Sequence, residues 1–184
     1  NGNVLEMIGL GKDITEEKDR ELAARNNASR LAEAQRVAKI GSWEIELKTG
    51  ALWWSDETHR MFGISKGPDA QLTFDDFFNR VFALDKDMVR AAFDKSLAEK
   101  LPFDMVYRVA VPNQPLKHVH ALGEHHYDDA GNPSRSLGTV RDITAEVIRE
   151  NKIREVEAEA KELQEYNDYV VQKSPMFIVA LHFN

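Results

Sequence analysis

Cysteine is absent from this sequence, and its absence removes several kinds of site at once. The chain can form no disulfide and no thiolate metal site, and it offers no cysteine nucleophile. A flavin–cysteinyl adduct is excluded for the same reason. A chain without disulfides suits the cytoplasm, where we expect this one to work, whether or not a longer protein is anchored in a membrane.

Long apolar runs and an excess of basic charge are missing as well. No apolar run approaches the roughly 20 residues that a membrane-spanning helix needs. Lys and Arg number 24 against 31 Asp and Glu, which gives a net charge of −7. Nucleic acids and anionic lipid surfaces select basic faces. We therefore expect no nucleic-acid partner and no membrane contact in this segment.

Enzyme motifs are missing too. The sequence has no glycine-rich phosphate loop of the G-x-G-x-x-G or G-x-x-x-x-G-K type. We find no pairing of a nucleophile with a base, no metal triad, and no phospho-acceptor or cyclase motif. The sequence thus predicts no catalytic residue and no enzymatic activity in this fragment.

What the sequence does contain is an alternation of strand and helix patterns. Period-two alternation of apolar and polar residues predicts strands at 42–47, 51–55, 103–111, 116–127 and 134–143. Caps and helical spacing predict helices over 15–39, 56–62, 73–81, 85–100 and 144–173. This order indicates an α+β fold, in which a five-stranded antiparallel sheet carries short helices on one face. Long N- and C-terminal linker helices flank it.

One short pattern occurs twice at a constant offset. Lys12-Asp13-Ile14-Thr15 reappears as Arg141-Asp142-Ile143-Thr144, with matching glycines before each copy. A fixed period indicates a tandem duplication. We therefore divide the chain into the tail of a preceding unit, a linker helix, a complete unit, a coiled-coil helix and the start of a following domain. Their ranges are 1–15, 16–39, 40–144, 145–173 and 174–184.

The complete unit carries a series of characteristic motifs. They are Ile40-Gly41-Ser42-Trp43-Glu44, Trp54-Ser55-Asp56, Phe62-Gly63-Ile64, Tyr107-Arg108, Asp129-x-Gly131-Asn132-Pro133 and Gly138-Thr139-Val140-Arg141-Asp142-Ile143-Thr144. In these motifs the unit resembles the Per-Arnt-Sim (PAS) sensor domain of the subtype that ends in a PAC motif. The resemblance implies the PAS fold and a tandem-PAS bacterial signalling protein. Sensor histidine kinases and diguanylate cyclases are the types it suggests.

Three positions depart from the family pattern. Phe82-Ala83-Leu84-Asp85 stands where the family often has His-Pro-Asp-Asp, Asn113-Gln114 replaces an Asp-Gly turn, and His118 replaces a tryptophan. These changes fall on the rim of the family's pocket. They leave the identity of any ligand open, while the fold is unaffected.

The repeated Asp-Ile-Thr motif is the candidate for signal coupling. It stands where a strand passes into a helix, so Asp142 can cap the helix while its backbone stays in the sheet. In relatives the corresponding motif couples the core to an effector, and the resemblance implies the same here. The candidate coupling residues are Arg141, Asp142, Ile143, Thr144, Asp13 and Thr15. The alternative is a helix cap with no further role.

The last long helix carries a seam with alternating spacings of three and four residues. Its members are Ile153, Val156, Ala160, Leu163, Asn167 and Val170. This spacing, with Asn at an a position, is typical of a parallel coiled coil and predicts a homodimer through the flanking helices. A face packed on its own domain is the alternative.

Aromatic residues supply a candidate ligand pocket between helices and sheet. With two histidines of the fourth strand, the set is Trp43, Trp54, Phe62, Phe77, Phe78, Phe93, Tyr107, His118 and His120. Such residues either line a cavity for a small molecule or simply fill a core. Haem-binding relatives carry their axial ligand in the helix at 85–100, which here has no histidine. Haem is therefore not expected, and the cofactor stays unknown.

Together these observations predict a sensory domain that relays a conformational signal through its flanking helices. Its partners would be a second copy and the adjacent PAS and effector domains of the same chain. A ligand-free structural dimerisation module is the first alternative. A second alternative is a metal-binding regulator, because His118 and His120 share one face of a strand. No third ligand is evident, so we assign no metal site.

Overall fold

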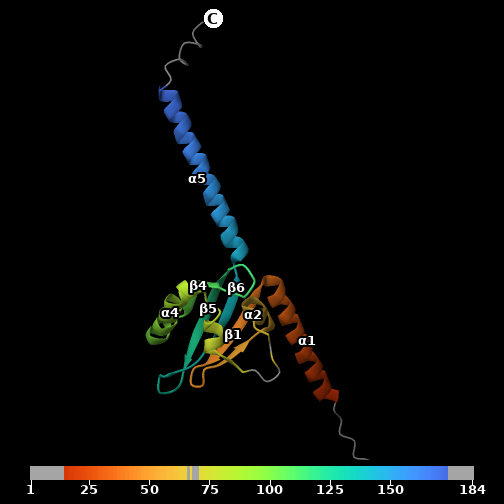
Figure 1. The fold of residues 1–184 in the computed structure, drawn as a ribbon. Coiled ribbons are helices and arrows are strands. Elements are labelled where there is room, and N and C mark those ends of the chain that lie inside the picture. Colours follow the sequence, from red (N-terminus) through yellow and green to blue (C-terminus); the bar gives the residue numbers. More distant parts are fainter. Residues whose placement is uncertain (1–14, 66, 68–70, 174–184) are drawn as a thin grey trace, which may run out of the picture.

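The computed structural model describes residues 15–65, 67 and 71–173. At its centre lies an antiparallel sheet of six strands in the order β3-β2-β1-β6-β5-β4 (Figure 1). The strands are β1 (Ile40–Glu46), β2 (Ala51–Trp54), β3 (Leu72–Thr73), β4 (Phe103–Val109), β5 (Lys117–Tyr127) and β6 (Pro133–Asp142).

The five predicted strands are all present, and a short sixth is added to them. β1 and β2 form the predicted hairpin, whose turn includes Gly50 in the left-handed region with φ 72°. β3 pairs with β2 through only two residues, Leu72 and Thr73. A strand of two residues is too short to leave a periodic signal in the sequence. The expected five-stranded sheet is therefore extended by one edge strand.

Short helices cover one face of this sheet. They are α2 (Asp56–Phe62), α3 (Phe74–Phe78), the 3₁₀ turn η1 (Ala83–Asp85) and α4 (Lys86–Glu99). Ser55 caps α2 by accepting a hydrogen bond from the Thr58 amide, and Gly63 ends the helix with φ 62°. α3 is shorter than the predicted helix over 73–81, because the backbone from Arg80 to Phe82 bonds to β4 instead.

The core lies between these helices and the sheet. It is built from buried apolar residues that alternate along the strands, such as Tyr107 and Val109 on β4 and Val119 and Ala121 on β5. α2 adds Met61 to this cluster. The inward faces of β4 and β5 are therefore largely apolar, which is the cause of their period-two sequence pattern.

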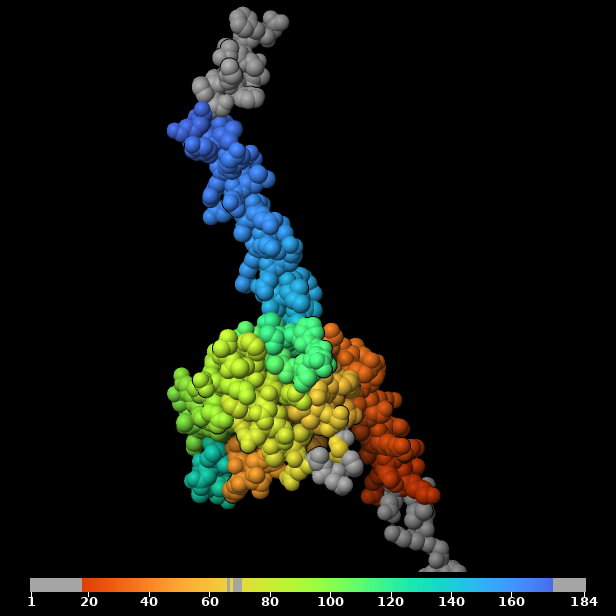
Figure 2. Space-filling model, in the orientation of Figure 1, coloured from red at the N-terminus to blue at the C-terminus, as the bar shows by residue number. Residues whose placement is uncertain are grey.

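Two long helices leave this core, α1 (Thr15–Ala38) and α5 (Thr144–Lys173). Figure 2 shows α5 as a separate column that extends away from the packed body. Its residues beyond the first turn are exposed along the whole helix. Neither α1 nor α5 is long and apolar enough to cross a membrane, and the same holds for each of the other described helices. Residues 1–14 of the predicted preceding unit and the predicted following domain (174–184) lie outside the described residues.

Candidate functional site

Strand β6 passes into helix α5 through the Asp-Ile-Thr motif. The Asp142 carboxylate accepts hydrogen bonds from the Thr144 amide (2.9 Å) and the Thr144 hydroxyl (2.6 Å). The backbone of Asp142 meanwhile pairs with Val119 of β5. One residue therefore belongs to the sheet through its backbone and holds the first residue of the helix through its side chain.

Strand β5 is tied to the same junction through His118. The His118 amide donates to the Thr144 hydroxyl oxygen (2.9 Å), and the Ile143 amide donates to the His118 carbonyl (2.9 Å). Arg141 adds an ion pair to Glu146 in the first turn of α5 (3.3 Å). The start of α5 is thus anchored to two central strands.

The end of α1 reaches this junction from the other side. Lys39, which follows α1 with φ 52°, accepts a hydrogen bond at its carbonyl from the Asp142 amide (3.3 Å). The next residue, Ile40, pairs with Arg141 across β1 and β6. The incoming and outgoing helices therefore meet on neighbouring strands. The candidate residue Thr15 begins α1, while Asp13 lies outside the described residues.

A polar network connects α1 to the wall of the core. The Gln35 amide group donates to Ser42 Oγ (2.8 Å), and the Ser42 backbone bonds to both Ser55 and Thr58 (2.9 Å each). Thr58 is buried and faces the central cavity. α1 thus reaches the cavity-lining Thr58 through one intermediate residue, Ser42.

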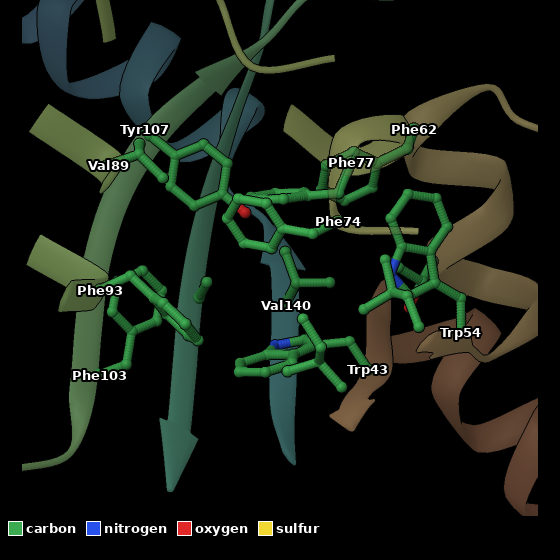
Figure 3. A pocket seen from close by; sticks show the side chains of 14 residues that line it. Trp43, Trp54, Phe62, Phe74, Phe77, Val89, Phe93, Phe103, Tyr107 and Val140 are labelled. Carbon is green, nitrogen blue, oxygen red and sulfur yellow. The ribbon is translucent and has the colours of Figure 1, made fainter. Parts of the chain in front are cut away.

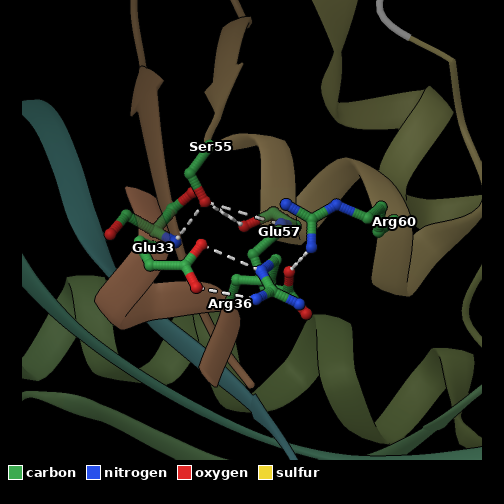
Figure 4. Close-up of polar contacts among 7 residues, drawn as sticks. Glu33, Arg36, Ser55, Glu57 and Arg60 are labelled. Carbon is green, nitrogen blue, oxygen red and sulfur yellow. Dashed lines mark hydrogen bonds and ion pairs between the residues drawn. The ribbon is translucent and has the colours of Figure 1, made fainter. Parts of the chain in front are cut away.

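Ion pairs accompany this network (Figure 4). Glu33 pairs with Arg36 on α1, and Glu57 pairs with Arg60 on α2. The hydrogen bond from Arg36 lowers the pKa of Glu33. Both pairs join residues of one helix and have an exposed partner, so they contribute little to the stability of the fold.

An apolar cavity of about 40 Å³ lies between helices and sheet (Figure 3). Its lining is Trp43, Ile45, Leu52, Trp54, Thr58, Phe62, Phe74, Phe77, Val89, Phe93, Phe103, Tyr107, Ala121 and Val140. Burial raises the pKa of the Tyr107 phenol well above its usual range. Pockets for drug-sized ligands measure roughly 300 to 1,000 Å³. The side chains therefore nearly fill this space.

Trp43 closes the sheet side of the cavity by lying over two glycines. Gly123 and Gly138 are paired directly across β5 and β6. A Cβ atom on Gly123 would lie 2.6 Å from the Trp43 ring. The Trp43 indole also donates to the Thr139 carbonyl (3.1 Å). The Trp43 ring therefore occupies space that a side chain at Gly123 would take, and from there it lines the cavity.

Six of the nine predicted pocket residues line the cavity, and three do not. Phe78 packs under the Arg90 guanidinium on the helix side. His118 and His120 must be corrected, because Val119 and Ala121 face the core and strand alternation places the histidines on the opposite face. Sequence reasoning missed Phe74 and Phe103, which carry the same aromatic signal as their neighbours.

The histidine pair does not form a metal centre here. His120 contacts Asp104 (2.7 Å), whereas the buried Nδ1 of His118 has no hydrogen-bond partner. Among the described residues, no group of three or more His, Cys, Asp or Glu side chains could hold a metal ion. Nothing in this geometry favours the metal-binding alternative.

The predicted seam of α5 is open to solvent. Ile153, Val156, Leu163 and Val170 are 51%, 50%, 61% and 40% exposed. Ala160 and Asn167, at the remaining seam positions, are exposed as well. The seam therefore does not pack on the described part of its own domain, which was the alternative reading of its spacing.

A buried ion pair that the sequence did not reveal anchors α4. Asp85, only 5% exposed, accepts hydrogen bonds from the Arg108 amide (2.8 Å), Nε (2.9 Å) and Nη2 (2.5 Å). The bonds from Arg108 lower the pKa of Asp85. The guanidinium also lies 4.4 Å from the centre of the Phe82 ring. The unusual Phe82–Asp85 segment thus fastens the start of α4 to β4.

Comparison with known proteins agrees with this architecture. Residues 51–140 match the family model described as PAS fold. The chain is 30% identical to the sensor protein FixL of Bradyrhizobium diazoefficiens over 115 residues, which cover 62% of this chain and 22% of that protein. It is 26% identical to the probable diguanylate cyclase DgcE of Escherichia coli over 144 residues, or 78% of this chain and 13% of that protein.

A solved structure shows the same arrangement. The sensory box histidine kinase/response regulator from Burkholderia thailandensis superposes with a TM-score of 0.60 at 25% identity, covering 72% of this chain and 98% of that one. The chain spans less than a quarter of the length of either curated relative.

Proposed function

Because this chain contains a PAS domain, we propose that it is a sensory, signal-transducing module that relays a conformational change to an effector domain of the same polypeptide. The change would enter through α1 or the core and leave through α5. Relatives named as a sensor protein, a blue-light-activated histidine kinase and a probable diguanylate cyclase support a histidine kinase or a cyclase as the effector.

The observation that carries this proposal is the hydrogen-bonded node around Asp142. Its carboxylate holds Thr144, its amide holds Lys39, and β5 reaches the same threonine through His118. Since β5, β6, α1 and α5 share these few bonds, a shift of any one element changes the direction of α5. Two arrangements of the helix would then correspond to two signalling states.

A parallel dimer of α5 would carry the signal onward. The exposed seam from Ile153 to Val170 supports this pairing, with Asn167 setting its register. In such a dimer Lys152 at a g position faces Glu157 at the e position of the second copy. The repeated Asp-Ile-Thr motif supports a PAS unit before residues 40–144. We place both units in a cytoplasmic signalling protein.

The test is Asp142→Ala in the full-length protein, with Asp129→Ala in an exposed turn as the matched control. We expect Asp142→Ala to abolish regulation of effector output while unfolding of the PAS core changes by only about 1 kcal/mol, as for a lost helix cap. Asp129→Ala should leave both unchanged. Normal regulation in Asp142→Ala would rule out the coupling role.

The small cavity supports a second candidate, a ligand-free dimerisation module. At about 40 Å³ the space leaves no room for a drug-sized ligand without movement of its walls. Native mass spectrometry of freshly purified protein reads bound mass and oligomeric state together. A co-purifying small molecule on a dimer supports a sensor, and a bare dimer supports the ligand-free module.

A further inference from the structure

A chain of hydrogen bonds crosses the interior from α4 to the sheet. His125 of β5 lies between two serines, with Nε2 2.8 Å from Ser96 Oγ on α4 and Nδ1 2.7 Å from Ser136 Oγ on β6. Ser136 is fully buried and Ser96 is 6% exposed. Neither the Asp142 junction nor the cavity lining includes any of these three residues.

The hydrogen bonds define where the imidazole carries its proton. Ser96 Oγ donates its single proton to the Phe93 carbonyl (2.8 Å), because a carbonyl can only accept. Ser96 therefore accepts from His125, which places a proton on Nε2. Nδ1 then carries a lone pair and accepts the Ser136 hydroxyl proton. The observed contacts are all satisfied by the neutral imidazole.

A second proton on His125 would conflict with this arrangement. The Ser136 hydroxyl would have to turn and accept from Nδ1–H, so its own proton would lose the acceptor that Nδ1 provides, at a fully buried oxygen. The elements packed against the ring present Phe93 and Ser96 from α4, and Ser136 from β6. None of these side chains ionises.

Charged groups on the last turns of α4 and at its C-cap make contacts of their own. Lys95 pairs with Glu99 (4.0 Å), and the C-cap residue Lys100 lies over the Tyr127 ring (5.0 Å). No carboxylate is therefore placed against the imidazole by the contacts that hold it. Burial accordingly lowers the pKa of His125.

His125 also contacts one residue of the cavity wall, Phe93. The two rings meet edge to face, with centroids 5.5 Å apart, and Phe93 lines the cavity from α4. The Tyr127 hydroxyl holds the following turn by donating to the Leu97 carbonyl (3.0 Å). The C-terminal half of α4 is thus fastened to β5 by two side chains, and one of them, His125, is an imidazole that can take up a proton.

We propose that His125 is a proton-binding site that latches α4 to the sheet. The neutral imidazole holds the helix through Ser96 and Ser136. Uptake of a proton breaks this chain, releases the C-terminal half of α4, and moves the Phe93 wall of the cavity. The domain thereby responds to acidification, whether or not α5 passes that response to an effector.

The direction of the pH dependence follows from the linkage between proton binding and release of the latch. A group whose pKa is lower in the latched state than in the released state stabilises the latch above the released pKa, near 6.5 for histidine. As the pH falls below that value, the equilibrium constant for release rises by up to about tenfold per pH unit, until the pH reaches the lowered pKa. The latch is therefore closed at neutral pH and opens in acid.

Amide exchange of residues 93–99 in the 184-residue chain, corrected for intrinsic rates between pH 7.5 and 5, measures this release. We expect the opening constant to rise in wild type below about pH 6.5. His125→Gln, which can donate and accept in the same places without titrating, should remove that rise. The matched control is His126→Gln, because His126 is the adjacent residue and is exposed. This variant should keep the rise in the opening constant.

The proposal is overturned if wild-type exchange shows no such rise or if His125→Gln retains it. Should His125→Gln fail to fold, NMR titration of the His125 imidazole in wild type decides the matter. We expect the proton on Nε2 at neutral pH and a titration midpoint below the ordinary histidine range, with the rise in exchange levelling off near that midpoint. A midpoint in the ordinary range, or exchange that keeps rising well below the midpoint, contradicts the latch. Neither readout depends on the Asp142 relay.

Discussion

The PAS core and the helix α5 use similar apolar side chains in opposite ways. In the core, Val89 of α4 is 1% exposed and Phe62 of α2 is 2% exposed. On α5, Ile153 and Leu163 are 51% and 61% exposed, although their spacing is as regular as that on α4. The core is therefore complete within one chain, whereas the α5 seam needs a surface that the described part of the chain does not supply.

The two regions therefore need different measurements. Changes in the core should alter the free energy of unfolding at any protein concentration, because the lost contacts lie within one chain. Changes on the α5 seam should alter association, which depends on concentration. Substitutions in each region test this separation, and the expected loss of stability falls from Trp43 through Asp85 to Leu163.

The largest effect is expected for Trp43→Ala, with Trp53→Ala as its matched control. Removing a packed tryptophan costs about 3 to 5 kcal/mol and leaves a cavity, and Trp43 covers the glycine pair at Gly123. Trp53 is 57% exposed on the other face of the sheet, so its loss should change stability by less than about 0.5 kcal/mol. Urea unfolding measures both values.

The same pair of variants tests whether the Trp43 side chain is the group that fills the cavity. Trp43→Ala should gain stability with a small aromatic probe such as indole, while wild type and Trp53→Ala should not. An equal loss of stability in the two tryptophan variants would contradict the role assigned to Trp43. Indole stabilisation of wild type would show instead that the cavity walls move readily.

The next largest effect is expected for Asp85→Ala. It leaves Arg108 without its partner and should cost about 2 to 3 kcal/mol, as for hydrogen bonds to a charged group. Asp104→Ala, which removes an exposed carboxylate from the same strand as Arg108, is the control and should cost far less. Because Arg108 lowers the pKa of Asp85, the difference from wild type is full above about pH 4 and shrinks as the pH falls through the lowered value. A difference that does not vary in acid would argue against the ion pair.

The smallest effect on unfolding of the core is expected for Leu163→Ala in α5. Its side chain is 61% exposed, so unfolding of the core should change by less than about 0.5 kcal/mol. The dissociation constant of the dimer should nevertheless rise by about tenfold or more, because both copies lose a seam contact. Sedimentation equilibrium measures the dimer, and Glu162→Ala on the neighbouring outward position should leave it unchanged. Equal dimerisation of Leu163→Ala and wild type would remove Leu163 from the seam.

Much of the fold could be predicted because its signals are local. The helix over Asp56–Phe62 follows from a serine cap and a terminal glycine, and the start of α5 from the Asp142 motif. The strands of β4 and β5 follow from alternation alone. The candidate pocket was less predictable, because alternation along a strand does not say which of its two faces is buried. The prediction put His118 and His120 on the inner face of β5, whereas Val119 and Ala121 occupy that face in the structure.

The order of the elements, the chain reversals and the position of the sheet-to-helix junction can be read from the sequence alone. These depend on periodicity and capping over a few residues, and a single chain records them directly. Only the tertiary structure decided that the cavity is nearly filled, that Asp85 holds Arg108, and that His125 lies between Ser96 and Ser136. Such pairings join segments far apart in the chain, and they depend on strand register and side-chain volume, which no local pattern encodes.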